Sequence, residues 1–207
     1  MKLLLASSNR KKLRELCGLL APLALELCAP QDVGGIVDVV EDQPTFAGNA
    51  AKKAISAAQH TGMWALADDS GLEVDALGGA PGVRSARFAG EPADDARNNA
   101  ELLRRLAGVP AAERGARFVC AIALAHPGGI LAATFEGQAQ GRILAEPRGT
   151  GDFGYDPLFL FTEPGYPQTG SSFAELDSAT KSSVSHRGRA LARLVAALPA
   201  IRSESLD

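Results

Sequence analysis

Two neighbouring carboxylates, Asp68 and Asp69, are followed by Ser70 and lie between two apolar runs. The run before them, residues 63–66, predicts a buried strand, and the alternating pattern of residues 72–76 predicts a second strand. Adjacent carboxylates resist burial unless a cation offsets their charge. An oxygen-rich cluster of this kind suits Mg²⁺, which usually takes one or two carboxylates together with substrate phosphates. The alternative interpretation is a polar turn between the two strands that holds no metal.

A polar turn near the start of the chain has the features of an anion-binding site. It lies between a predicted strand, residues 2–6, and a predicted helix with an apolar face that begins near residue 10. The first amides of a helix lack intrahelical partners and the helix dipole is positive there, so both attract a phosphate. The alternative is an N-cap followed by a solvated basic face. The candidate phosphate contacts are Ser7, Ser8, Asn9, Arg10, Lys11 and Lys12.

Two later segments also carry groups able to recognise a ligand. The glycine-rich stretch 146–157 holds two aromatic side chains, and exposed aromatics among glycines are typical of a platform on which a base stacks. A hydrophobic plug is the equally open alternative. The second segment brings cationic and imidazole groups to the start of the last predicted helix. The residues concerned are Phe153, Gly154, Tyr155, Asp156, Lys181, His186 and Arg187.

The elements expected around these residues belong to an α/β protein. Thr45 is expected to cap an alanine-rich helix that ends at Gly62. The run 118–125 is nearly continuous in apolar residues and predicts a central strand buried on both faces. Further predicted elements are a strand at 23–28, a helix at 92–107, a hairpin strand at 130–140, a short strand at 158–161, helical structure from 173 to about 201 and a frayed tail at 202–207.

Composition limits the partners. The chain of 207 residues is 46% apolar and 22% charged with a net charge of −3, so it is globular and has no broad basic surface for nucleic acid. The scattered cysteines Cys17, Cys28 and Cys120 are expected to be small buried hydrophobes in a reducing compartment. No apolar stretch is long enough to span a membrane. We therefore expect a soluble cytoplasmic protein with one domain, 1–207, that binds neither nucleic acid nor membrane.

Taken together, the candidate residues favour a nucleoside triphosphate site. They lie in loops and at helix starts beside apolar elements, and in open α/β sheets such positions gather at one edge. The set offers lysines and amides for phosphates, carboxylates for a metal, and aromatic, histidine and arginine side chains for a base. The chain has no G-x-x-x-x-G-K-[ST] segment and no G-x-G-x-x-G segment after a strand, which argues against a P-loop NTPase or a dinucleotide enzyme.

Four segments resemble the inosine triphosphate pyrophosphatase family, the XTP/dITP diphosphatases, in the same order along nearly the whole chain. They are SSNRKKLREL (7–16), ADDSGLEVDALGGAPGVRSARFAG (67–90), PRGTGDFGYDPLF (147–159) and KSSVSHRGRAL (181–191). The resemblance implies a long central mixed β-sheet flanked by helices, with two lobes and a cleft between them. It also implies a homodimer and the Mg²⁺-dependent hydrolysis of ITP, dITP or XTP to the monophosphate and pyrophosphate.

The resemblance also assigns roles to individual residues. Asp69 matches the proposed general base and metal ligand, Glu41 the second metal carboxylate, and Asp68 stands beside them as a further candidate ligand. Substrate contacts by the same match are Ser7, Asn9, Lys12, Lys53 and Ser70, the loop Phe153, Gly154, Tyr155 and Asp156, and the base-recognising Lys181, His186 and Arg187.

The chain departs from the family pattern at three positions. Gln43 and Gly48 stand in the run QPTFAGNA where the family usually has a glycine and a glutamate, and Asp152 replaces a more usual glycine. Gly48 removes a capping-box acid and any part that a carboxylate would play there. Two other functions stay open. One is a Maf-like nucleotide pyrophosphatase acting on dTTP or UTP, since the basic turn of such enzymes is similar to Arg10, Lys11 and Lys12. The other is a nucleotide-binding module without catalysis.

Overall fold

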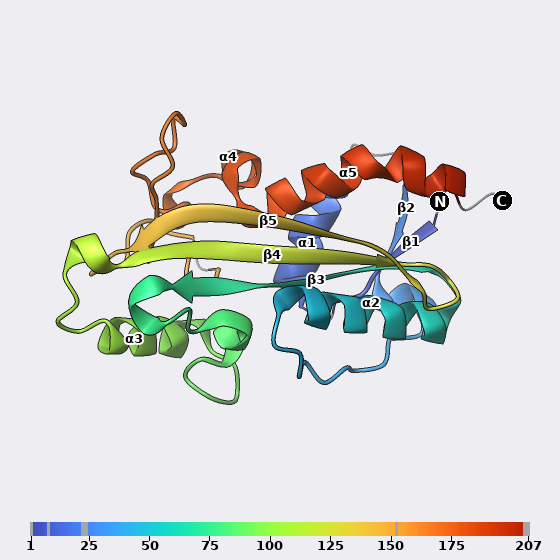
Figure 1. Ribbon diagram of the computed structural model, residues 1–207, viewed down its shortest axis with the longest axis horizontal. Helices are drawn as coiled ribbons and strands as arrows, with labels where there is room; N and C mark the ends of the chain where they lie inside the picture. The colour runs from blue at the N-terminus through green and yellow to red at the C-terminus, as the bar shows by residue number, and fades with distance from the viewer. Residues whose placement is uncertain (1, 8, 22–24, 152, 205–207) are drawn as a thin grey trace. The chain divides into compact units, whose positions relative to one another are not determined.

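A computed structural model gives the protein's structure for residues 2–7, 9–21, 25–151 and 153–204, of which the side chains of 10, 11, 14 and 202–204 are not described. Within this part, the strands pair in the order β2 (Glu26–Cys28), β1 (Lys2–Leu5), β3 (Trp64–Val74), β4 (Gly115–Ala125), β5 (Leu131–Ile143) and β6 (Phe159–Phe161) (Figure 1). β1 is parallel to β2 and β3, whereas β5 and β6 are antiparallel. The expected mixed α/β sheet is therefore confirmed.

The chain divides into two compact units. Unit 1 comprises Met1–Asp69, Cys120–Gly137 and Arg187–Asp207, and unit 2 comprises Ser70–Val119 and Gln138–His186. The long strands β3 (Trp64–Val74), β4 (Gly115–Ala125) and β5 (Leu131–Ile143) each run from one unit into the other. The cleft that the resemblance implies stays a prediction.

Unit 1 is built on β1 (Lys2–Leu5), β2 (Glu26–Cys28) and the adjoining parts of the long strands, with α1 (Arg10–Leu20), α2 (Phe46–Thr61) and α5 (His186–Glu204) packed beside them (Figure 1). Its core joins α1, through Leu16 and Leu20, to α5, through Leu191 and Leu194. α2 presents a different kind of surface, because its buried side chains are mostly alanines that allow close approach.

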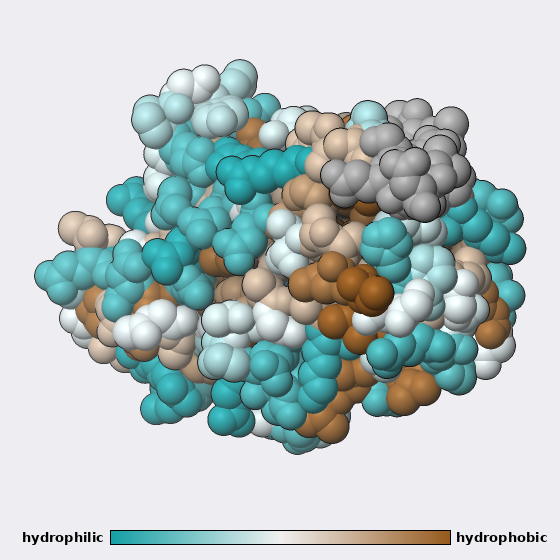
Figure 2. All heavy atoms as spheres, turned by 45° about the vertical axis from the view of Figure 1, so that its right-hand side comes forward, coloured by the Kyte–Doolittle hydropathy of each residue, from teal (hydrophilic) through white to brown (hydrophobic). Residues whose placement is uncertain are grey.

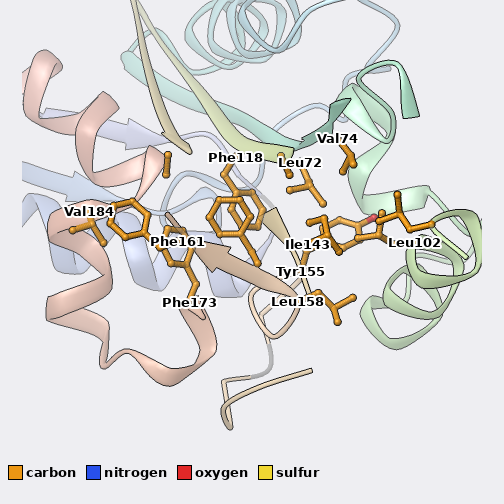
Figure 3. Packing of buried hydrophobic residues seen from close by; sticks show 14 residues of the cluster. Leu72, Val74, Leu102, Phe118, Ile143, Tyr155, Leu158, Phe161, Phe173 and Val184 are labelled. Carbon is orange, nitrogen blue, oxygen red and sulfur yellow. The ribbon is translucent and has the colours of Figure 1, made fainter. Parts of the chain in front are cut away.

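Unit 2 holds the remaining helices and the last strand. They are α3 (Asp95–Arg105), α4 (Ser178–Val184) and β6 (Phe159–Phe161), with 3-10 turns at Asp75–Leu77, Gly82–Arg87 and Phe173–Glu175. The core of the unit is aromatic, and Figure 3 shows Phe118, Phe161, Phe173 and Tyr155 packed with aliphatic side chains from the surrounding elements.

Most predicted elements are present, with shifted ends. The caps of α2 are confirmed, because the Thr45 hydroxyl accepts a hydrogen bond from the Gly48 amide and Gly62 is left-handed with φ 65°. The predicted strand at 23–28 is β2, although residues 22–24 lie outside the described part. α5 continues to Glu204, so helix extends into the segment expected to fray. Cys28 and Cys120 are buried as expected, but Cys17 is exposed.

The turn predicted at Asp68 and Asp69 is wrong. Both residues, with Ser70 and Gly71, lie inside the single strand β3, where their neighbours are almost all buried. The composition of the segment is that of a turn, but the backbone is paired in the sheet and the carboxylates receive cations from helices that are distant in sequence. Local composition cannot reveal those partners.

The surface combines hydrophobic and hydrophilic residues. On the face shown in Figure 2, hydrophobic atoms reach the surface in limited areas bordered by hydrophilic ones. Among the residues that the structure describes, the large apolar side chains that are most exposed are Val37, Val40 and Ile130. Among the residues described, no helix combines the length and the hydrophobicity that crossing a membrane requires.

Candidate active site

The strand conformation of β3 separates its two carboxylates. Successive side chains of a strand point to opposite faces of the sheet, so Asp68 and Asp69 do not face each other. Asp68 meets Lys12 from α1 and Arg187 from α5, whereas Asp69 meets Asn49 and Lys53 from α2. Each carboxylate therefore has its own cationic partners, which is the condition for burying both.

The Asp69 face gathers two carboxylates around one ammonium. Lys53 Nζ lies 2.7 Å from Glu41 Oε1 and 3.5 Å from Asp69 Oδ1. Asn49 Nδ2 donates to the other Asp69 oxygen at 3.1 Å, and the Asn49 side-chain oxygen accepts from the Gln43 amide at 3.0 Å. Asn49 and Lys53 are one helical turn apart, so they reach Asp69 from the same side of α2.

Burial and charge shift the ionisation of this group. Burial, to which the nearby Glu41 adds, raises the pKa of Asp69 above its ordinary value, in spite of the attraction of Lys53 and Lys12. Burial alone would lower the pKa of Lys53, but the attraction of Asp69, Asp68 and Glu41 raises it instead. The group thus pairs a firmly charged ammonium with a carboxylate that takes up a proton more readily than most, as suits a general base.

The Asp68 face is a buried ion cluster. Lys12 Nζ lies 3.2 Å from Asp68 Oδ2, and Arg187 approaches the same oxygen at 3.3 Å. Arg187 also pairs with Glu15 of α1. Burial alone would raise the pKa of Asp68, but Lys12 and Arg187 hold that pKa well below its usual range. Asp68 is therefore an anion that ties α1 to α5.

The polar turn before α1 confirms the predicted N-cap, while its contact with a phosphate stays a prediction. Asn9 caps the helix, because its side-chain oxygen accepts from the Lys12 amide at 3.1 Å, and the Asn9 amide donates to Ser7 Oγ at 3.3 Å. Lys12 is 18% exposed at its side chain, so it borders both Asp68 and solvent. Ser8 lies outside the described residues, as do the side chains of Arg10 and Lys11.

Unit 2 holds Lys181 and His186, two of the three predicted base-recognising residues, beside a group of aromatic rings. Lys181 Nζ forms an ion pair with Asp156 and lies 5.0 Å from the centroid of the Phe153 ring. The imidazole of His186 stacks on Phe118 with centroids 4.7 Å apart and an interplanar angle of 14°. Phe118 in turn stacks on Phe173. Phe153 is partly exposed, and the stacking of a base on its ring stays a prediction.

Three other predicted residues lie where the structure does not by itself indicate a contact with substrate. Tyr155 is 5% exposed and its ring lies in the core, so its side chain fits the hydrophobic-plug interpretation. Arg187 is 1% exposed and is occupied by Asp68 and Glu15. Ser70 is half-buried in β3 at the first position of unit 2. Their contacts with a substrate stay predictions.

Sequence reasoning missed two residues of the charged clusters. Asn49 orients Asp69 and is 1% exposed, and Glu15 holds Arg187. A signal for Asn49 was present, because it lies one turn before Lys53 on the same helix. Glu15 had no comparable signal, since an acid on a charged helix face usually faces solvent.

Mg²⁺ fits the Asp69 face by its donor chemistry. Among the described residues, no group of three or more His, Cys, Asp or Glu side chains is placed to hold a metal. Mg²⁺ requires no such cage, since it commonly binds through one or two carboxylates with waters and substrate phosphates. Glu41 and Asp69, which share one ammonium, supply two carboxylates of this kind.

Comparison with known proteins gives a consistent result. The model of the Ham1 family matches residues 3–197. The chain is 56% identical to a dITP/XTP pyrophosphatase of Desulforamulus reducens over 191 residues, which are 92% of each chain. It is 52% identical to a dITP/XTP pyrophosphatase of Geobacter sulfurreducens, covering 93% of this chain and 94% of that one. The solved structure of a HAM1 protein from Coxiella burnetii is similar with a TM-score of 0.85 and 39% identity, covering 96% and 98% of the two chains.

Proposed function

The chain belongs to the Ham1 family, and we propose that it is a hydrolase that converts the non-standard purine triphosphates ITP, dITP and XTP to the monophosphate and pyrophosphate. The observation that carries this proposal is the Asp69 face, where two carboxylates and a lysine converge on the strand that the family resemblance singled out. Removal of such nucleotides from the cellular pool is the corresponding role.

Glu41 and Asp69 are the residues that would hold Mg²⁺. The ion would neutralise phosphate charge and make a bound water easier to deprotonate. Lys53 forms ion pairs with both of these carboxylates. Asp68 as a third ligand stays a prediction, and its ion pairs with Lys12 and Arg187 favour a structural role.

Asp69 is the proposed general base. Its raised pKa makes it a better proton acceptor than an ordinary aspartate, while the hydrogen bond from Asn49 fixes its orientation. The water that it deprotonates attacks the α-phosphorus, and pyrophosphate leaves. Lys12 and Lys53 bind the phosphates and stabilise the charge of the leaving pyrophosphate, because phosphoryl transfer depends mainly on positioning and neutralisation.

The groups of unit 2 recognise the purine. Phe153 offers a ring for stacking, and Lys181 and His186 offer donors for the 6-keto oxygen of hypoxanthine or xanthine. Adenine presents an amino group there and would leave a donor unpaired, at a cost of about 1–3 kcal/mol for each group. Guanine also has a 6-keto oxygen, so this reasoning does not separate it from hypoxanthine.

The test is the substitution Asp69→Asn. It removes the base and one metal carboxylate while keeping the shape of the side chain, so we expect pyrophosphate release from ITP to fall by at least about 10²-fold. Asp42→Asn is the matched control, since Asp42 is an exposed acid that pairs with Lys52. Turnover by Asp69→Asn at the wild-type rate, with folding intact, would remove Asp69 from this role.

The remaining parts of the proposal rest on the resemblance. A homodimer and a cytoplasmic location are predictions of this kind, and analytical ultracentrifugation tests the first. Mg²⁺ is tested by comparing the release of pyrophosphate with and without a chelator, with Mg²⁺ added back.

A further inference from the structure

We propose that Asp95 and Asn99 of α3 are positioning residues that hold the loop 153–156 in the shape needed to receive the purine. The inference rests on the proposed function, since it takes this loop to be the one that contacts the base. It adds two residues from a helix on which the sequence placed no functional group.

The geometry is a two-point clamp on one residue. The Gly154 amide donates to Asp95 Oδ2 at 3.1 Å, and the Gly154 carbonyl accepts from Asn99 Nδ2 at 2.9 Å. Asp95 and Asn99 are four residues apart, so they share one face of α3. Both backbone polar groups of Gly154 are thus taken by side chains of the same helix.

Gly154 is where the loop needs such support. Its φ of 56° is left-handed, a conformation that glycine adopts freely and from which it also departs freely. Hydrogen bonds to a charged carboxylate are stronger than those between neutral groups, so the clamp selects one conformation out of several. The next residue is fixed independently, because the Tyr155 hydroxyl donates to the Ser85 carbonyl at 2.8 Å.

The same helix face also packs against the loop. Leu102, three residues after Asn99, belongs to the cluster that buries Tyr155, and Figure 3 shows the Tyr155 ring close to Leu102 and Ile143. Two polar contacts and one apolar contact from α3 therefore act on neighbouring loop residues.

The clamp controls the two residues that flank it. Phe153 precedes Gly154 and Asp156 follows Tyr155, and both contact Lys181. The orientation of Gly154 and Tyr155 consequently decides how the Phe153 ring and the Asp156 carboxylate stand around the lysine. A loop held in this way before binding does not have to be ordered by the substrate, which lowers KM.

Asn99 keeps its contact with Gly154 although this position leaves its own side-chain oxygen unsatisfied by any described residue. Its side-chain oxygen is buried and has no hydrogen-bond partner within the residues that the structure describes. A buried acceptor without a partner is unfavourable, so the bond to Gly154 is the gain that sets the side chain in this place.

The experiment is steady-state kinetics of pyrophosphate release from ITP by Asp95→Ala and Asn99→Ala. We expect KM to rise about tenfold or more in each, with kcat within about threefold of wild type, because the chemistry at Asp69 is untouched. Asp95→Asn keeps an oxygen that accepts from the Gly154 amide and should restore KM to within about threefold of wild type.

Asp94→Ala is the matched control. Asp94 is the adjacent acid and caps α3 through the Arg97 amide, so its loss should lower Tm without raising KM. A rise of KM in Asp94→Ala equal to that in Asp95→Ala would mean that only helix stability matters, and it would overturn the clamp.

Phe153→Ala separates the inference from the proposed function. If Phe153→Ala leaves KM for ITP unchanged, the loop does not contact the base, and both the loop assignment and the clamp fall. If Phe153→Ala raises KM while Asp95→Ala and Asn99→Ala do not, the loop assignment stands and the clamp alone is refuted.

Discussion

At the scale of single residues, the protein buries two adjacent carboxylates by turning them to opposite faces of a strand. Asp68 forms ion pairs with Lys12 and Arg187. Asp69 forms an ion pair with Lys53 and accepts a hydrogen bond from Asn49. The consequence is a division of roles between neighbours. Asp68 has a pKa below its ordinary value and stays charged, whereas Asp69 has a raised pKa and can accept a proton.

Arg187 should matter for stability as well as for any contact with substrate. Arg187→Ala leaves Asp68 with one fewer cation and removes the partner of Glu15, and breaking a buried pair of this kind costs about 3–5 kcal/mol. Urea unfolding measures the loss. Arg104→Ala, which removes an exposed guanidinium paired with Glu101, should stay near wild type.

A double-mutant cycle tests whether Arg187 stabilises the protein through its ion pair with Asp68. If Arg187 acts by compensating Asp68, its removal should cost less in an Asp68→Asn background, because only Glu15 then loses a cation. Equal losses in the two backgrounds would show that Arg187 stabilises the fold in some other way.

Gln43 and Gly48 depart from the family pattern together, and the structure links them. A Cβ built at Gly48 would lie 2.9 Å from Gln43 Cβ and 3.2 Å from Gln43 Cγ, so the glutamine occupies space that a larger residue at 48 needs. A glutamate at 48 would otherwise be favourable, since it completes a capping box with Thr45.

We therefore expect the two positions to be coupled. We compare the change in the free energy of unfolding that Gln43→Gly causes in the Gly48→Glu variant with the change that it causes in the wild type. The first should be more favourable than the second by about 0.5–3 kcal/mol. Thermal or urea unfolding of the four proteins gives the coupling, and simple additivity would refute the steric link.

At the scale of elements, α2 is the helix on which the Asp69 face depends. It begins at a Thr45 cap, ends at a left-handed Gly62, and carries Asn49 and Lys53 on one side. Four of its alanines, Ala50, Ala54, Ala57 and Ala58, are buried, so a neighbour packs close to the backbone. The cap and the close packing together fix the position of α2, and with it the positions of Asn49 and Lys53.

The cap can be tested directly. Thr45→Ala removes the acceptor for the Gly48 amide and should lower the free energy of unfolding by about 1 kcal/mol. Thr45→Ser keeps the hydroxyl oxygen and should retain most of that stability. A Thr45→Ala protein as stable as wild type would show that the cap contributes nothing here.

The elements also show what the sequence can and cannot predict. Apolar runs and caps are local signals, and they located α2, the buried strand β4 and the hairpin strand β5 closely. β3 was divided wrongly at Asp68, because an acidic, glycine-containing segment has the local composition of a turn. What makes it a strand is the pairing with β1 and the cations of three helices, and these partners are distant in sequence.

At the scale of the whole molecule, the chain passes between its units at four places, and two of them adjoin residues of the predicted site. Asp69 ends a segment of unit 1 and Ser70 begins unit 2, while His186 ends unit 2 and Arg187 returns to unit 1. The resemblance to the family predicted roles for these residues, because the segments that contain them match it in the same order. The side chains that hold predicted residues in place are recognised only from the folded structure: Asn49 bonds to Asp69, and Glu15 pairs with Arg187. Asp95 and Asn99 bond to Gly154 in the same way.

The most direct test of the account is a comparison of nucleotides in one assay of pyrophosphate release with Mg²⁺ present. We expect ITP, dITP and XTP to be hydrolysed with kcat/KM at least about tenfold above ATP, since an adenine leaves a donor unpaired. The products should be the monophosphate and pyrophosphate, and no orthophosphate. Preferential hydrolysis of dTTP or UTP, or binding of ITP without turnover, would contradict the central claim.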